Sequence, residues 1–361
     1  AIQFMVHDAA IAIDFPNGSR TLILREIEID RARKHACADD VYGYSDFTPE
    51  QGLSGDRDTA AAQSAAECLL RNGITMVIAD RTLPLIYADA IQNVGIAVEL
   101  DYEMGVTDRR VKTKKEIDYL REAQKVTEQV MRMACKTIAN SETNERGVLH
   151  IGGDPLTSES MRTMIDSFLH ERNFFNPSSI IAGGSDGGDC HNLGSGNLYT
   201  GQPIIIDIFP LDKNSMYNGD CTRTVVHGSI PAEVEKMHNA VVAAKVAGTA
   251  AVKAGISGEL IHLEVIRVLI EHGYYEGLPA DDDPSTFCSM PHGTGHGIGL
   301  DVHEPPLLDR NGAKLLAGDV ITIEPGLYSH AIGGVRVEDM LLVTEDGCDN
   351  FNTLPEGLTW S

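Results

Sequence analysis

Short apolar runs separated by turn residues fill the first hundred residues of the chain. The runs "AIAIDF" and "RTLILR" flank "PNGS", which predicts a β-hairpin with an Asn-Gly turn. The stretch "DTAAAQSAAECLLRNG" predicts a helix that ends at Gly73, and "ITMVIAD" predicts a buried strand. A helix at "LPLIYADAIQN" and a strand at "IAVELD" continue the alternation. We therefore expect a small α/β domain over residues 1–112.

A basic and polar segment, "GVTDRRVKTKK", marks the expected domain boundary. The long helix that follows, "TKKEIDYLREAQKVTEQVMRMACKTIAN", has apolar residues at helical spacing. Further helices are expected at "SESMRTMIDSFLHERN", which begins with Ser and Glu at capping positions, at "AEVEKMHNAVVAAKVAGTAAVKAG" and at "GELIHLEVIRVLIEHG". Between and after them lie β-rich runs such as "PIIIDIF", "CTRTVVHG" and "DVITIEPGLY". Residues 113–361 are therefore predicted to form an α+β domain with a largely antiparallel sheet.

Composition and charge narrow the possible partners. The 361 residues include 53 acidic and 29 basic side chains, which gives a formal net charge of -24. A field of this sign repels phosphate backbones and anionic lipid, so we expect neither nucleic-acid nor membrane partners. No stretch approaches the roughly 20 apolar residues that a membrane helix needs. The seven cysteines are scattered and lack a CxxC pair. This pattern is typical of free thiols in a reducing compartment, so we expect a cytoplasmic protein.

Four acids stand in β-rich runs where apolar residues are expected. Asp207 ends "PIIID", and Asp220 opens "DCTRTVV". Glu324 interrupts "VITIEPGLY", and Glu338 lies within "GGVRVEDMLLV". Taken singly, each would be interpreted as a capped strand end or a salt-bridged acid, because buried carboxylates are costly unless they are paired or bind a metal. Four of them, each beside turn residues, could instead supply one site.

Three histidines lie in the glycine-rich stretch "SMPHGTGHGIGLDVHEPP", namely His292, His296 and His303. The first two are four residues apart, which is the spacing of a helical zinc-binding pair. The glycines oppose that interpretation, since each costs about 1 kcal/mol inside a helix. We expect an extended or irregular segment instead, with its backbone against a neighbour that leaves no room for side chains.

Four carboxylates in one site would repel one another unless some were protonated or cations were bound. Two divalent cations would balance the four negative charges. An oxygen-rich set of ligands with one imidazole suits Mn²⁺, Fe²⁺, Co²⁺ or Zn²⁺. Two such ions can activate a water molecule and polarise a carbonyl, which indicates hydrolysis.

The order of the motifs "IIIDIFPLDKNSMYNGDCTRT", "HGTGHGIGLDVHEPP", "ITIEPGLY" and "GGVRVED" resembles the M24 metallopeptidases of pita-bread fold. Within them it is similar to the branch of aminopeptidase P and prolidase. The resemblance covers roughly residues 114 to 361, and the α/β pattern before them is similar in layout to a creatinase-type N-terminal domain. It implies an α+β protein, with a catalytic pita-bread domain at 113–361 and a smaller α/β domain at 1–112. A dinucleotide site in the first domain is not expected, because no GxGxxG follows a strand there.

The resemblance also implies a role for each metal-binding position. Asp207 would chelate one metal ion, while Asp220 and Glu338 would bridge two ions. His296 and Glu324 would complete the shell of the second ion, and Glu324 would accept the proton of the attacking water. Two divalent ions are therefore expected, with Mn²⁺ first and Co²⁺, Fe²⁺ or Zn²⁺ as alternatives.

Four further residues are implied on the substrate side. His292 and His303 would contact the substrate and stabilise the tetrahedral intermediate or its leaving group. His191, in "GGDCHNLGSG", would be a third substrate-binding histidine. Arg336 lies two residues before Glu338 on the same strand face, where it would orient a bridging carboxylate and join the substrate-binding set. Outside these motifs, each histidine would be interpreted as an ordinary surface or packing residue.

The chain departs from the family pattern in the hairpin between the two aspartates. They are separated by 220 − 207 = 13 positions, an insertion of two, and "DIFP" stands where a small residue and glycine are usual. Phe209 and Pro210 are therefore expected near the site. Arg310 lies in a loop where prolidases use an arginine to hold a dipeptide's carboxylate, and it is a candidate for the same role.

The favoured function is a dinuclear metal-dependent peptidase that cleaves the Xaa-Pro bond of small peptides or dipeptides, as a homodimer in keeping with the family. Proline suits such a site because its tertiary amide lacks an N–H and bends the chain. An alternative is a creatinase-like or ectoine-hydrolase-like enzyme that cleaves a C–N bond in a small non-peptide substrate. A non-catalytic binding module on a decayed peptidase fold should have lost ligands, whereas all five expected ligand positions are kept.

Overall fold

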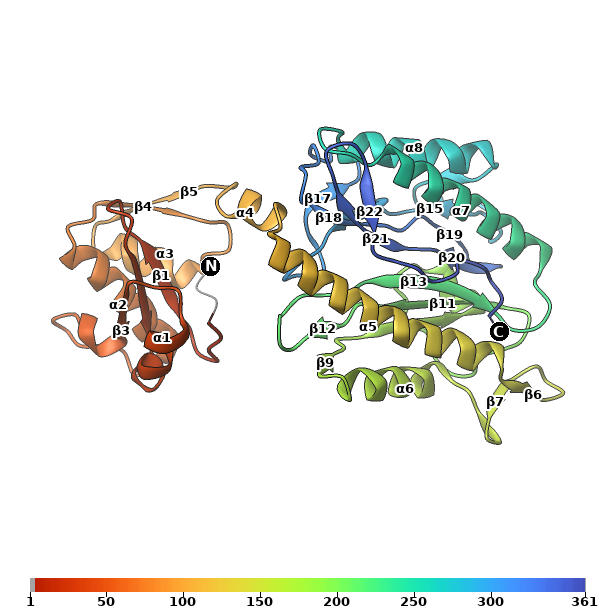
Figure 1. Ribbon diagram of the computed structural model, residues 1–361, viewed down its shortest axis with the longest axis horizontal. Helices are drawn as coiled ribbons and strands as arrows, with labels where there is room; N and C mark the ends of the chain where they lie inside the picture. The colour runs from red at the N-terminus through yellow and green to blue at the C-terminus, as the bar shows by residue number, and fades with distance from the viewer. Residues whose placement is uncertain (1–3, 361) are drawn as a thin grey trace. The chain divides into compact units, whose positions relative to one another are not determined.

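The computed structural model describes residues 4–360 and divides the chain into two compact units, residues 1–107 and 108–361 (Figure 1). The first unit is a small α/β fold. β1 (Ile11–Asp14) and β2 (Arg20–Leu24) form the predicted hairpin, in which Gly18 has φ 85°. β3 (Asp40–Gly43) pairs in parallel with β2, and β4 (Met76–Ala79) pairs in parallel with β5 (Ala97–Leu100). The helices are α1 (Ile29–His35), α2 (Arg57–Arg71), α3 (Leu85–Asn93) and α4 (Val106–Arg110), with 3₁₀ turns η1 (Glu26–Glu28) and η2 (Tyr44–Phe47).

All the elements predicted for this region are present, but the prediction that "ITMVIAD" is buried is wrong, because Met76 and Ile78 of β4 are exposed on one face of the strand. α2 ends as expected, because Gly73 adopts a positive φ of 68° just beyond the last turn, where a side chain would be strained. The elements α1, β3, η1, η2 and α4 were not predicted, and α4 spans the boundary between the two units at 107/108. α1 buries only Ala32, so it lacks the apolar stripe that indicates a helix.

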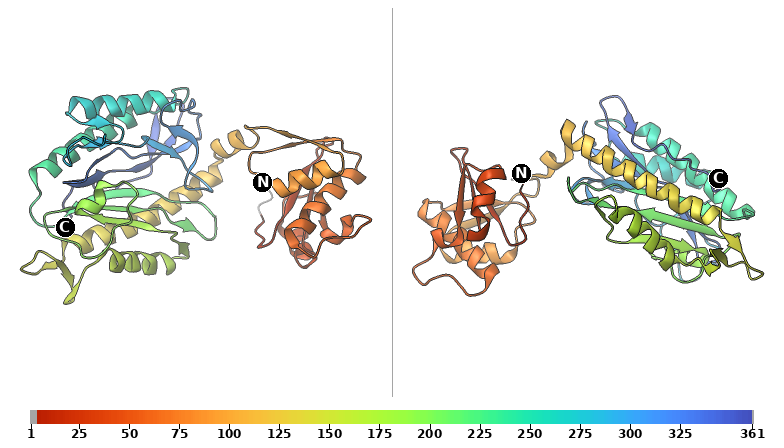
Figure 2. Two further views of the ribbon diagram at one scale, coloured as in Figure 1. Left: turned by 180° about the vertical axis from the view of Figure 1, so that it is seen from behind. Right: turned by 60° about the horizontal axis from the view of Figure 1, so that its bottom comes forward.

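The second unit places strands between two pairs of helices (Figures 1 and 2). α5 (Lys114–Ala139) and α6 (Ser158–His170) share a buried apolar core with the sheet β10-β11-β13. α7 (Ala232–Ala251) and α8 (Gly258–Glu271) share a second core with strands from the C-terminal part of the chain. The sheet strands on the first side are β10 (Ser179–Gly183), β11 (Pro203–Ile208) and β13 (Cys221–Val226).

Several sheets, rather than one, make up the β structure of this unit. A five-stranded sheet has the order β17 (Glu304–Leu308), β16 (Gly295–Gly297), β18 (Val320–Ile323), β21 (Asp339–Val343), β22 (Cys348–Asn350). A four-stranded sheet has the order β14 (Tyr275–Glu276), β15 (Ser289–Met290), β19 (Gly326–Ser329), β20 (Gly333–Arg336). Smaller elements are β6 (Glu142–Thr143), β7 (Leu149–Ile151), β8 (Asp154–Pro155), β9 (Phe174–Phe175), β12 (Leu211–Asp212) and the 3₁₀ turn η3 (Gly184–Gly188). Among the described strands of this unit only β14 and β15 pair in parallel, so the expected antiparallel character is confirmed.

The helix starts depend on local capping chemistry. Thr113 and Glu116 form a capping box at the start of α5. At α6 the predicted cap is wrong by one residue. Thr157 is the N-cap and Ser160 closes the box, while Ser158 is already helical. A small hydroxyl residue precedes the helix either way, so the sequence pattern alone did not separate the two positions.

The basic segment that was expected to separate two domains belongs structurally to the second unit from Asp108 onward. Arg110 forms an ion pair of 2.7 Å with Asp319, and Lys112 forms one of 2.5 Å with Glu304. These positive residues are therefore paired inside the second unit, and the division between the units falls within the segment, at 107/108. None of the described helices has both the length and the apolar character that crossing a bilayer requires. All seven cysteines are free thiols, as expected.

Candidate metal centre

The four predicted acids lie where strands of the two halves of the second unit meet. Asp207 is on β11, and Asp220 comes directly before the neighbouring strand β13. Glu324 directly follows β18, and Glu338 directly precedes its partner β21. The backbone N–H of Glu338 donates to the carbonyl of Thr222 at 3.1 Å, which joins the two groups of strands at this point.

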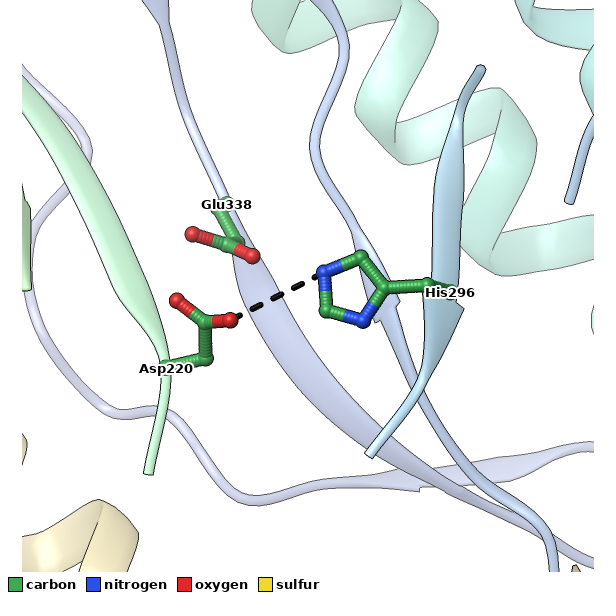
Figure 3. A group of neighbouring side chains, drawn as sticks. All are labelled: Asp220, His296 and Glu338. Carbon is green, nitrogen blue, oxygen red and sulfur yellow. Dashed lines mark ion pairs between the residues drawn. The ribbon is translucent and has the colours of Figure 1, made fainter. Parts of the chain in front are cut away.

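His296 completes the cluster from the middle of β16. Ligand atoms of Asp220, His296 and Glu338 all lie within 4.8 Å of one another, and the three side chains face one another in Figure 3. The Nε2 atom of His296 is 3.7 Å from Asp220 Oδ2 and 3.4 Å from Glu324 Oε1. Asp207 is close enough for its charge to raise the pKa of Asp220 and of Glu338. Three of the five predicted ligands therefore form a tight group, with Glu324 and Asp207 beside it.

The glycines around His296 explain its extended backbone. A Cβ on Gly295 would lie 2.0 Å from the carbonyl oxygen of Thr322, and a Cβ on Gly297 would lie 2.3 Å from that of Pro305. The strand is therefore in close backbone contact on both sides, as the glycine pattern predicted. The alternative of a helical histidine pair is wrong, since His296 is on a strand.

Crowding of carboxylates in a buried site makes the ionised forms unfavourable. Burial, followed by the charges of neighbouring acids, raises the pKa of both Asp220 and Glu338 well above the usual values. Burial raises the pKa of Glu324 to about 7. Burial, with a smaller contribution from His303, lowers the pKa of His296 to about 3, so its imidazole is neutral and able to bind a metal.

The donor atoms fit divalent cations. Asp207 Oδ1 is buried and has no hydrogen-bond partner among the described residues, which is costly for a carboxylate oxygen unless a cation neutralises it. Four carboxylates and one neutral imidazole form an oxygen-rich set of the kind that Mn²⁺, Fe²⁺, Co²⁺ or Zn²⁺ accept. The arrangement therefore suits metal ions better than it suits the protein alone.

Arg336 lies beside the cluster and is buried, with 3% of its surface exposed. It donates from Nη2 to Asp207 Oδ2 at 2.6 Å and from Nε to Thr222 Oγ1 at 3.2 Å. Thr222 in turn donates to Glu338 Oε2 at 2.8 Å. Arg336 thus contacts Asp207 directly and reaches the expected bridging carboxylate of Glu338 only through Thr222. These hydrogen bonds favour a positioning role for Arg336 over the predicted contact with substrate.

His292 is held by a residue that sequence reasoning missed. Arg336 Nη1 donates to the hydroxyl oxygen of Tyr328 at 2.7 Å, and that hydroxyl is 2.8 Å from His292 Nε2. His292 Nδ1 is 2.7 Å from the carbonyl oxygen of Gly293, so Nδ1 carries the proton and Nε2 accepts from Tyr328. Burial lowers the pKa of His292 to about 4, which keeps this ring neutral. Tyr328 follows Glu324 by four residues in "EPGLY", which was the available signal.

His303 and His191 lie at the exposed margin of the cluster. The rings of His296 and His303 meet edge to face, with centroids 4.2 Å apart. Burial lowers the pKa of His303, while the nearby charge of Asp207 raises it. His191 is near enough for its charge to lower the pKa of both His292 and His303. The three predicted substrate-side histidines are therefore neighbours.

The remaining predicted residues lie as follows. Phe209 is half-buried and Pro210 is buried in the hairpin after Asp207. The insertion leaves Asp207 on β11 and Asp220 at the edge of β13. Arg310 is 57% exposed at its side chain and donates to both carboxylate oxygens of Glu276 at 2.7 Å.

Comparisons with known proteins agree with this geometry. The family model described as metallopeptidase family M24 matches residues 118–345. The chain is 29% identical over 241 residues to an Xaa-Pro dipeptidase of Pyrococcus furiosus, a match that covers 66% of this chain and 62% of that protein. It is 34% identical over 171 residues to an Xaa-Pro dipeptidase of Pyrococcus horikoshii, covering 47% and 45%. Both matches span less than two thirds of the relative.

The fold matches that of solved structures over almost the whole chain. The structure of an Xaa-Pro dipeptidase from Bacillus anthracis aligns with a TM-score of 0.80 at 22% identity, covering 99% of this chain and 90% of the other. The predicted α+β architecture with a pita-bread domain is confirmed.

Proposed function

Since the chain belongs to metallopeptidase family M24, we propose that it is a dinuclear metal-dependent peptidase that cleaves the Xaa-Pro bond of small peptides or dipeptides. The observation that carries the proposal is the buried convergence of four carboxylates on one neutral imidazole. The Xaa-Pro dipeptidases among its relatives support the choice of substrate.

Asp207, Asp220, His296, Glu324 and Glu338 would hold the metal ions, with Mn²⁺ the favoured ion. Bound divalent ions would supply Lewis acidity toward the peptide carbonyl and would make water a stronger acid. Two ions are proposed because two divalent cations would balance the formal charge of the four carboxylates.

The chain's own residues would move the protons. Glu324 Oε1 accepts a hydrogen bond from Thr322 Oγ1 at 3.3 Å, which orients the carboxylate next to His296. Glu324 would accept a proton from the attacking water while the water oxygen bonds to the carbonyl carbon. It would return that proton to the proline nitrogen as the C–N bond breaks, which converts one water and one peptide into an acid and an amine.

The histidines at the margin would contact the substrate. His303 and His191 are exposed beside the cluster, where a ring N–H can donate to the substrate carbonyl or to its tetrahedral intermediate. His292 would contact the substrate in the orientation that its hydrogen bond with Tyr328 sets. The expected homodimer is checked independently by light scattering.

The test is metal content, measured together with hydrolysis. The purified protein is analysed by mass spectrometry for metals and assayed with Mn²⁺ on Gly-Pro and on Xaa-Pro-Xaa tripeptides. We expect two metal ions per chain and Mn²⁺-dependent cleavage, and the preferred length separates dipeptidase from aminopeptidase. Glu324→Gln should abolish cleavage, whereas Glu345→Gln, an exposed acid outside the cluster, should not. Two metals without cleavage would redirect the search to non-peptide substrates, and neither metal nor cleavage would refute the proposal.

A further inference from the structure

One long helix contacts the backbone of a proposed metal ligand through a buried polar side chain. Gln124 lies on α5 and is 0% exposed. Its Nε2 donates to the carbonyl oxygen of Asp220 at 2.6 Å, and its Oε1 accepts from the N–H of Asp220 at 2.8 Å. One amide side chain therefore pairs with both main-chain groups of a single residue, as a neighbouring β-strand would.

The same amide also reaches the start of β21, the strand that Glu338 directly precedes. Gln124 Nε2 also donates to Asn352 Oδ1 at 2.9 Å. Asn352 Oδ1 accepts in addition from the N–H of Met340, two residues after Glu338, at 2.9 Å. The Nδ2 of Asn352 contacts Cys221 Sγ, directly after Asp220, at 3.5 Å. The two amides thus connect the backbone at Asp220 with the backbone after Glu338.

The approach of α5 to this backbone is close. A Cβ on Gly219 would lie 2.1 Å from Thr127 Oγ1 and 2.9 Å from the carbonyl oxygen of Ala123. The segment that enters Asp220 therefore packs directly on the turn of α5 that holds Gln124, and the helix sets the position of Gln124.

In the ionised form that binds a metal, Asp220 and Glu338 repel each other. They directly precede strands of different sheets, so this repulsion tends to separate the two strand ends. Hydrogen bonds to the carboxylates themselves would compete with metal ions for the same oxygens. Hydrogen bonds to the backbone do not compete with them. A backbone clamp can therefore hold the two residues together without adding a further donor to their oxygens, of which Glu338 Oε2 already accepts from Thr222.

We propose that Gln124 and Asn352 form a clamp that positions Asp220 and Glu338 for joint metal binding. The clamp rests on the proposed function, because it assumes that these carboxylates share metal ions. Gln124 and Asn352 are positioning residues, since they act through the backbone and contact neither the carboxylates nor the substrate.

The test is metal affinity of the full chain, measured by calorimetric titration with Mn²⁺ and by the visible absorption spectrum with Co²⁺. Gln124→Leu should weaken Mn²⁺ binding by about 10- to 100-fold and alter the Co²⁺ spectrum. At saturating Mn²⁺ its KM for peptide should stay within about twofold of the wild type. Thr137→Val is the matched control. Thr137 is half-buried further along the same helix and its hydroxyl contacts Met133 Sδ at 3.7 Å, so Mn²⁺ affinity should be unchanged.

Asn352→Ala is the second variant, because Asn352 is half-buried and its loss is better tolerated. Combined with Gln124→Leu, it should weaken binding by less than the product of the two single effects, since both belong to one clamp. Wild-type Mn²⁺ affinity in Gln124→Leu, or independent effects in the double variant, would overturn the clamp and leave the peptidase proposal standing. Absence of Mn²⁺ binding by the wild type would overturn both.

Discussion

Lys112 provides the sharpest test of how the basic segment is anchored. Its ammonium lies 2.5 Å from Glu304 Oε1, and the two side chains are 2% and 3% exposed. Arg109 also pairs with the other oxygen of Glu304. Removing one partner of a buried ion pair costs about 3–5 kcal/mol, because the other charge stays buried. Since Arg109 still faces Glu304 in Lys112→Met, we expect the lower end of that range, about 3 kcal/mol.

The single tryptophan offers a direct assay of the second unit. Trp360 is 8% exposed and belongs to the same buried cluster as residues of α5 and α6. Its fluorescence during urea unfolding therefore reports on this unit alone. With a urea dependence of roughly 3 kcal/mol per molar, a loss of about 3 kcal/mol moves the midpoint down by roughly 1 M.

The control is Lys114→Met, two residues along the chain, where the side chain is exposed. It should shift the midpoint by less than about 0.2 M, since surface substitutions stay within about 0.5 kcal/mol. The double variant Lys112→Met/Glu304→Leu removes both buried charges and should recover much of the lost stability. Equal midpoints for Lys112→Met and Lys114→Met would show that the buried pair of Lys112 and Glu304 does not anchor the segment.

Three further predictions concern the site and its support. Arg336→Lys should lower kcat/KM by roughly 10- to 100-fold. The reason is that an ammonium cannot replace the planar guanidinium that contacts Asp207, Thr222 and Tyr328 together. Steady-state kinetics measures this change, and full activity of the variant would contradict the prediction. Gly297→Ala should cost about 1–3 kcal/mol or more of unfolding free energy because its Cβ meets a carbonyl oxygen at 2.3 Å, whereas Gly347→Ala, with open space around it, should be nearly neutral in the same Trp360 assay. Burial alone would raise the pKa of Glu116, but hydrogen bonds involving Thr113 and Tyr217 outweigh it and lower that pKa. The ionised carboxylate therefore contributes fully to the free energy of unfolding above its unfolded pKa, and this contribution is lost as pH falls through the folded pKa. The stability gap between wild type and Glu116→Gln should therefore narrow from about pH 6 to about pH 3.5, and a gap that is constant with pH would contradict the assignment.

The sequence predicted elements wherever the signal is local. The hairpin β1–β2, the end of α2 at Gly73 and the long helix α5 each depend on turn residues, caps and apolar period within a few residues. α1 and β3 were missed, because a short element with few buried side chains has no such period.

The candidate site shows the same division. The sequence could mark Asp207, Asp220, His296, Glu324 and Glu338 as candidates, because several acids stand in apolar runs and each candidate lies in a motif that resembles the family's. The groups that position these residues are not marked in the sequence. Gln124 and Asn352 are ordinary residues for a helix and a loop, and nothing in their immediate neighbours marks them.

Tertiary structure alone decided these contacts, because a hydrogen bond between residues far apart in the chain depends on how the elements pack. Gln124 meets Asp220 across 96 positions, and Thr222 meets Glu338 across 116. The basic segment shows it most plainly. Its composition is that of a linker, yet Lys112 is buried because packing brings Glu304 to it from 192 positions away. Local chemistry therefore determined which residues are candidates for metal binding, and packing determined which groups position them.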